Sequence, residues 1–223
     1  MTTVESARAT TSGAAGLGRE RGELRLGIVG AGKLGTTLAR AAVAAGYDVG
    51  LSGSGPAEEI ALTVEVLAPG ARAMTTGDVV RHADVVVLAV PTHRFHELPG
   101  DLFAGKVLVD AMNYWPPVDG DDRELAAAAD GTSAVVQAHF PSARVVKSLN
   151  QLGYHEVDEL ARPEGAPDRT AIGAAGDDRR AVRAVTRLID RLGFDPVDAG
   201  SLEDGAALEP EGSRAQVGFT PTR

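Results

Sequence analysis

The stretch that most constrains the fold is LGIVGAGKLGTTLARAAVAAGYDVGLSGSG, residues 26–55. A β-rich run enters a Gly-x-Gly-x-x-Gly turn made by Gly30, Gly32 and Gly35, and an alanine-rich segment with helical periodicity follows. A second β-rich run comes about 20 residues after the turn. A strand, a tight turn, a helix and a second strand in this order are typical of parallel sheets, so the stretch predicts an α/β fold.

The rest of the chain repeats the alternation of β-rich and helical runs. The expected strands are residues 25–30, 48–51, 85–90, 107–110, 144–148, 170–173 and 196–198. The expected helices are residues 33–45, 57–67, 76–82, 123–138 and 177–192. The runs VVVLAV and VLVD carry apolar residues on both faces, as expected of strands covered by helices on each side. The pattern predicts a doubly wound, mostly parallel sheet of the Rossmann type.

Composition divides the chain into three predicted parts. Residues 1–23 are rich in Thr, Ser, Ala and Gly and predict a disordered tail. Residues 24–200 contain the alternating elements and predict one nucleotide-binding domain. Residues 201–223 predict a short C-terminal extension.

Charge and residue usage exclude several functions. A net charge of −9 opposes non-specific attraction to nucleic acid or to anionic lipid. The absence of Cys excludes disulfides and thiolate metal sites, and His93 and His96 lack a third ligand nearby, so no metal site is predicted. No stretch reaches the ~20 apolar residues of a membrane span, and no apolar signal core opens the chain. These features favour a cytoplasmic protein with no nucleic-acid or membrane partner.

The three glycines have distinct expected tasks in binding a dinucleotide. Gly30 allows the tight turn, Gly32 lets a pyrophosphate approach the backbone, and Gly35 lets the helix lie close to the sheet. Free N–H groups and the helix dipole then stabilise the phosphates at the start of the helix.

The end of the second strand lacks the acid that often binds the adenosine ribose. Residues 51–55 read LSGSG, so Ser52 and Ser54 offer hydroxyls where a carboxylate would repel a 2′-phosphate. This favours NADP(H) over NAD(H). Since no Arg or Lys lies between Asp48 and Arg72, a site indifferent to the 2′-phosphate stays open as the alternative.

Three loops are expected to meet at the carboxyl edge of the sheet, where ligands of doubly wound folds bind. They follow the third, fourth and fifth predicted strands and read AVPTHRFHE, DAMNYWPP and KSLNQLGYHE. Trp115, the single tryptophan, suits a flat heteroaromatic partner, and packing of Tyr114 and Trp115 within their own loop is the alternative.

The motifs together resemble a known family. LGIVGAGKLGTTLARAAVAAGYDV, ADVVVLAVP, VLVDAMNYWPP, ARVVKSLNQLG and LGFDPVDAGSLEDGAALEP occur in this order, from about Arg25 to Pro210. They resemble the NADPH-dependent deazaflavin reductases, that is, coenzyme F(420):NADP oxidoreductases and their bacterial relatives. Pyrroline-carboxylate reductases and the cytoplasmic part of membrane metalloreductases share the same dinucleotide domain.

The resemblance implies a set of binding residues. For the cofactors the matching positions are Gly30, Gly32, Lys33, Leu34, Gly35, Ser52, Ser54, Val90, Pro91, Met112 and Asn113. The loop residues expected to contact the second substrate are Trp115 and Asn150. Family members commonly carry an Arg in the ribose-phosphate loop, where this chain has Gly53 or Ser54.

The implied reaction is hydride transfer between NADP(H) and the deazaflavin coenzyme F(420), a small-molecule redox partner. Stacking of the two rings is the protein's task, so no catalytic acid or base is predicted. Two alternatives stay open. One is another NADPH-dependent reductase, acting on an imine, quinone or ferric substrate; the other is a non-catalytic NADP(H)-binding sensor or subunit. A homodimer is compatible with either.

Overall fold

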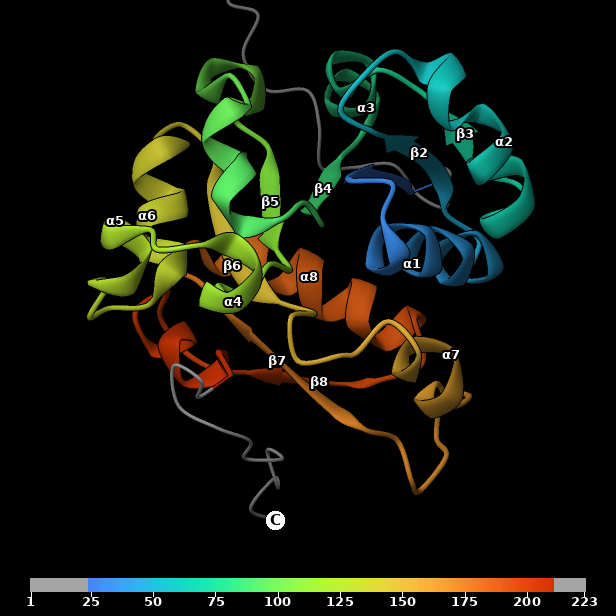
Figure 1. Ribbon diagram of the computed structural model, residues 1–223. Helices are drawn as coiled ribbons and strands as arrows, with labels where there is room; N and C mark the ends of the chain where they lie inside the picture. Colours follow the sequence, from blue (N-terminus) through green and yellow to red (C-terminus); the bar gives the residue numbers. More distant parts are fainter. Residues whose placement is uncertain (1–23, 211–223) are drawn as a thin grey trace, which may run out of the picture.

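An eight-stranded sheet with helices on both faces makes up residues 24–210, the part of the chain that the computed structural model describes (Figure 1). Its strands lie in the order β3-β2-β1-β4-β5-β6-β7-β8. Their bounds are β1 Arg25–Val29, β2 Asp48–Ser52, β3 Arg72–Ala73, β4 Val85–Leu88, β5 Val107–Asp110, β6 Arg144–Ser148, β7 Ala171–Ala175 and β8 Asp195–Asp198. The doubly wound α/β fold is confirmed.

The predicted tail 1–23 and residues 211–223 of the predicted extension lie outside the described residues. The division of the chain at residues 24 and 200 stays a prediction.

The sheet reverses its direction of winding at β1. This strand pairs in parallel with β2 on one side and with β4 on the other, so the loops that follow β1, β2 and β4 open at the same edge. Ligands of such sheets bind at this switch point.

One neighbouring pair departs from the parallel arrangement. β7 runs antiparallel to β6, and the pairing joins Lys147 to Ala175 and Ser148 to Ala174. Two side-chain hydrogen bonds add to this pairing: Ser148 Oγ, at the end of β6, donates to the Gly173 carbonyl, and the Gly173 N–H donates to Gln151 Oε1. The loop after β6 is therefore fastened to β7.

Helices cover both faces of the sheet (Figure 1). The α-helices are α1 Lys33–Ala44, α2 Ala57–Leu67, α3 Thr76–His82, α4 Pro116–Asp119, α5 Arg123–Ala126, α6 Thr132–His139, α7 Glu156–Leu160 and α8 Arg179–Arg191. The 3-10 helices are η1 Thr92–Glu97, η2 Gly100–Phe103 and η3 Asp204–Leu208.

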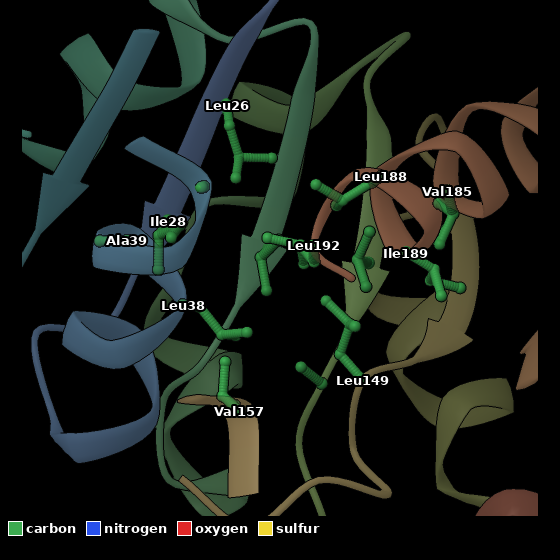
Figure 2. Close-up of a cluster of buried hydrophobic side chains, with 14 of the residues drawn as sticks. Leu26, Ile28, Leu38, Ala39, Leu149, Val157, Val185, Leu188, Ile189 and Leu192 are labelled. Atoms are coloured by element: carbon green, nitrogen blue, oxygen red, sulfur yellow. The ribbon is translucent and has the colours of Figure 1, made fainter. Parts of the chain in front are cut away.

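Two apolar clusters show which helices share a face. Side chains of α1, α2, α7 and α8 pack in one cluster, and those of α3, α5, α6, η1 and η2 pack in the other. Neighbouring strand residues alternate between them: Ile28 belongs to the first and Val29 to the second. Figure 2 shows the first cluster, where Leu38 of α1 and Leu188 of α8 reach toward the same strands.

The single helix expected over residues 123–138 is wrong. The segment forms two helices, α5 and α6, and Gly131 lies between them with φ of +86°, a conformation that glycine adopts at little cost. Asp122 caps α5, since its carboxylate accepts from the N–H groups of Glu124 and Leu125. A Cβ at residue 131 would lie 3.0 Å from Ala206 Cβ, so η3 leaves little room for a side chain at this turn.

Candidate dinucleotide-binding site

The glycine turn connects β1 to α1 and has the geometry that its spacing predicts. Gly30 has φ of +120°, and a Cβ there would lie 2.2 Å from the Ala89 carbonyl oxygen. A Cβ on Gly35 would lie 1.8 Å from the Gly30 carbonyl oxygen. The first and third glycines are therefore required by the fold itself, because backbone occupies the place of a side chain.

Gly32 differs from its two neighbours in the motif. Its φ is −78°, which any residue adopts, and a Cβ there would have nothing within 4 Å. No packing within the described residues therefore requires a glycine at this position. The open space lies at the N-terminus of the 12-residue helix α1, whose first turn has neither a side-chain cap nor an acidic residue. Such a helix end suits an anion held by backbone N–H groups.

A cavity of about 400 Å³ extends from this turn to the loops after β2 and β4. Its lining includes Gly30 and Gly32 together with Ser54, Val90 and Pro91. The structure thus brings these five predicted residues to one cavity. A volume of this size is in the range of small-molecule sites.

Ser52, the other predicted hydroxyl, does not line the cavity. It is completely buried, and its Oγ accepts a hydrogen bond from Thr76 Oγ1 at 3.1 Å. Its carbonyl oxygen accepts from the Gly30 N–H at 2.8 Å, which ties the end of β2 to the glycine turn. Thr76 itself lines the cavity and was not predicted as a site residue.

Lys33 and Leu34 begin α1 and lie on different sides of it. Leu34 is partly buried against the cluster that α1 shares with α8. Lys33 lines a second hollow of about 470 Å³, where its Nζ lies 5.0 Å from the centre of the Tyr154 ring. The two hollows share Ala31 and Gly32, so they meet at the glycine turn.

The loop after β5 is held by polar contacts with neighbouring loops. Asn113 Nδ2 donates to the Asn150 carbonyl, and Asn150 Nδ2 donates to Asn113 Oδ1, so the two predicted residues form a reciprocal pair. The Asn113 carbonyl accepts from Thr92 Oγ1 at 2.7 Å. Met112 is 3% exposed and packs in the cluster around α6.

Trp115 is the most accessible residue among those predicted after β5. It is 47% exposed, whereas Tyr114 is buried with its hydroxyl donated to the Gly120 carbonyl, so packing is the role the structure shows for the tyrosine. Asp119 accepts from the Trp115 N–H through Oδ2 and lies 2.9 Å from His93 Nδ1 through Oδ1. This carboxylate joins the loops after β4 and β5, a contact that sequence spacing could not reveal.

A buried ionic cluster centred on Lys147 contacts the loop after β5. Lys147 on β6 is completely buried; its Nζ donates to the Met112 carbonyl at 2.7 Å and to Asp110 Oδ2 at 3.3 Å. Ser133 Oγ donates to the same Asp110 oxygen, and Glu209 Oε1 lies 3.7 Å from the ammonium. The cluster joins β5, β6, α6 and the segment after η3 beneath the edge of the sheet.

Arg94 and Glu97 are the charged residues that line the 400 Å³ cavity. Both lie on η1, and Nε and Nη2 of the guanidinium donate to the two carboxylate oxygens, with the shortest contact at 2.7 Å. These bonds raise the pKa of Arg94 and hold the pKa of the Glu97 carboxyl below its usual range. Sequence reasoning missed both, because they follow β4 whereas the expected ribose loop follows β2.

The described residues show neither a metal centre nor a membrane span. Between residues 24 and 210 no group of three or more His, Cys, Asp or Glu could hold a metal ion. His93 contacts Asp119, and His96 stacks on Phe95 with ring centres 3.9 Å apart, so the two histidines have separate surroundings. In the same part of the chain, no helix is long and apolar enough to cross a membrane.

The switch-point cavity and the glycine turn are the arrangement found in Rossmann-type dinucleotide-binding folds. Residues 25–114 match the family model described as NADP oxidoreductase, coenzyme F(420)-dependent. This match bears out the resemblance to that NADP-dependent oxidoreductase family over residues 25–114, which are less than half of the chain.

Known proteins resemble the chain over most of its length. A hypothetical protein of Sinorhizobium meliloti is 28% identical with a TM-score of 0.68, and the match covers 82% of this chain and 88% of that one. A proposed F(420)-dependent NADP reductase of Arthrobacter sp. shares the fold, with 24% identity, a TM-score of 0.69 and coverage of 82% and 88%. The metalloreductase STEAP3 of Rattus norvegicus is 25% identical over 83% of this chain, which spans 36% of that protein's length.

Proposed function

We propose that this protein is an NADPH-dependent reductase that passes a hydride to a flat deazaflavin cofactor of the coenzyme F(420) type. The observation that carries the dinucleotide part is the open space over Gly32, at the uncapped start of α1 and beside the cavity. The family description and the Arthrobacter neighbour support the deazaflavin part.

The chain's own residues hold and orient the two rings in this proposal. Backbone N–H groups at the start of α1 bind the pyrophosphate, and Ser54 lies on the wall expected to hold the adenosine ribose. Val90 and Pro91 line the same cavity farther along the edge. Bound NADPH supplies the hydride, and the protein converts an encounter of two rings into a positioned one.

Trp115 is the residue that we assign to the second ring. Its exposed side chain follows β5, across the switch point from the β2 loop. Asn113 and Asn150 position this region through their reciprocal hydrogen bonds. This arrangement suits a small-molecule redox cofactor as the partner. A homodimer that formed elsewhere on the surface would leave the 400 Å³ cavity and the 470 Å³ hollow open.

The wild-type protein is expected to bind NADPH more tightly than NADH. No acidic residue lines the cavity from the β2 loop, so nothing there repels a 2′-phosphate. Hydrogen bonds to a charged phosphate are worth about 1–3 kcal/mol, or ~5- to 150-fold in affinity. Calorimetric titration with both dinucleotides measures the margin. Tighter binding of NADH would show that the LSGSG loop has been misinterpreted.

Trp115→Ala is expected to separate the two binding events. NADPH affinity should stay within about 3-fold, since Trp115 does not line the cavity, whereas deazaflavin reduction should fall about 10- to 100-fold through lost ring contact and orientation. Asn113→Ala should act in the same direction. Turnover, the NADPH dissociation constant and the melting temperature are measured together. Equal weakening of both ligands with a lower melting temperature would mean that Trp115 only packs its loop.

One assay distinguishes the proposed reaction from its alternatives. Purified protein is mixed with NADPH, and oxidation is followed with a deazaflavin, an imine, a quinone, a ferric chelate or no acceptor. Turnover with the deazaflavin alone supports the proposal. Turnover with the ferric chelate instead would favour the chemistry named for the rat relative. Tight NADPH binding without oxidation by any acceptor would favour a non-catalytic sensor or subunit.

A further inference from the structure

We propose that Arg94 is the residue that selects a 2′-phosphorylated dinucleotide, and that Glu97 holds its guanidinium until the phosphate binds. The proposal rests on the proposed function, since it concerns the same cavity. It assigns the phosphate-binding cation to the loop after β4, whereas the sequence pattern pointed to the loop after β2.

Few charged side chains line the cavity. The β2 loop contributes Gly53 and Ser54, and neither is charged. Glu58 and Glu59 lie in the first turn of α2 but do not line the cavity. Arg94 is the one cation among the described residues that line it. Any charge-assisted bond from a lining side chain to a phosphate here must therefore come from Arg94.

The Arg94 guanidinium has N–H donors that Glu97 does not use. The bonds to Glu97 use Nε and Nη2, and Nη1 has no hydrogen-bond partner among residues 24–210. The Arg94 side chain is 43% exposed, so a ligand in the cavity can reach it. A planar guanidinium binds phosphate through two parallel N–H bonds, which a lysine cannot reproduce.

The backbone of η1, which carries Arg94 and Glu97, is anchored to the rest of the protein. Phe95, which lies between Arg94 and Glu97 in the sequence, is completely buried. Thr92, at the start of η1, donates a hydrogen bond from its hydroxyl to the Asn113 carbonyl. The backbone that carries Arg94 is therefore held in place, and the side chain alone has to turn from Glu97 toward the ligand. Ser54 lines the same cavity from the β2 loop, and its hydroxyl has no side-chain hydrogen bond among the described residues.

Glu97 sets the strength of this selection. The Glu97 carboxylate offsets the positive charge of Arg94, and its own negative charge repels a dianionic phosphate. A phosphate offers more charge and more acceptor oxygens than the carboxylate, so it competes successfully for the guanidinium. Removal of the Glu97 charge should consequently strengthen binding of the phosphorylated dinucleotide, while leaving the unphosphorylated one almost unchanged.

Calorimetric titration of the full chain with NADPH, NADH, 2′,5′-ADP and 5′-AMP tests the proposal. For Arg94→Gln we expect NADPH and 2′,5′-ADP to bind about 10- to 100-fold more weakly, with NADH and 5′-AMP within about 3-fold of wild type. Arg94→Lys should recover only part of the loss. Glu97→Gln should tighten NADPH binding by about 3- to 10-fold.

Arg81→Gln is the matched control. Arg81 forms the same i,i+3 pair with Asp78, on α3, and does not line the cavity, so this variant should bind both dinucleotides as wild type does. Circular dichroism melting checks that every variant folds.

The outcomes separate this inference from the proposed function. Equal weakening of NADPH and NADH by Arg94→Gln would overturn the selection role, as would unchanged binding of both. Failure of the wild type to bind either dinucleotide would overturn the proposed function itself.

Discussion

Gly32→Val is expected to abolish dinucleotide binding while the protein stays folded. The backbone at Gly32 has ordinary dihedral angles and a Cβ there meets nothing, so the fold tolerates a side chain. The same open space is where a pyrophosphate approaches the start of α1 in the proposed site. A branched side chain would displace it, and we expect affinity for NADPH to fall by at least about 100-fold. Calorimetric titration and circular dichroism melting measure the two effects separately.

Gly35→Ala is the informative comparison. Its Cβ would lie 1.8 Å from the Gly30 carbonyl oxygen, so α1 must move away from β1 and the melting temperature should fall. The two substitutions thus distinguish a glycine needed for ligand space from one needed for packing. If the valine variant is folded and binds NADPH as well as wild type, the glycine turn does not hold the pyrophosphate.

Lys147→Met is expected to cause the largest loss of stability. Methionine fills a similar volume but removes the ammonium, so the buried Asp110 and the partly buried Glu209 lose their cation. Breaking a buried pair in this way costs about 3–5 kcal/mol. For a chain of this size the loss should lower the melting temperature by about 10 °C. Denaturant unfolding and thermal melting measure it.

Two further variants test the cause. Asp110→Asn combined with Lys147→Met should recover part of the stability, because the uncompensated charge of the buried Asp110 is gone while that of Glu209 stays. Arg25→Met breaks an ion pair whose side chains are 42% and 51% exposed, and should cost about 0–1 kcal/mol. If Lys147→Met costs no more than Arg25→Met, the cluster does not stabilise the fold through charge.

Much of the fold could be predicted because it is encoded in short stretches of sequence. The glycines at 30 and 35 are required by contacts within and beside one strand–turn–helix unit, and the apolar strands show their double coverage residue by residue. Prediction of secondary structure from the sequence was poorer where contacts with distant segments determine the local conformation. The helix expected over residues 123–138 breaks at Gly131, which lies against Ala206 of η3. The strand β3 has only two residues, too few to show a pattern in the sequence.

The candidate site divides in the same way. The spacing of Gly30, Gly32 and Gly35 indicates a dinucleotide turn from the sequence alone, because that motif is local. The places of Arg94 and Lys147 were decided by tertiary structure. Sheet order brings the loop after β4 to the same cavity as the loop after β2, and β6 beside β5 places Lys147 against Asp110. The partner of a charged side chain is the group that lies beside it in space. That group can be named only when the order of the strands is known.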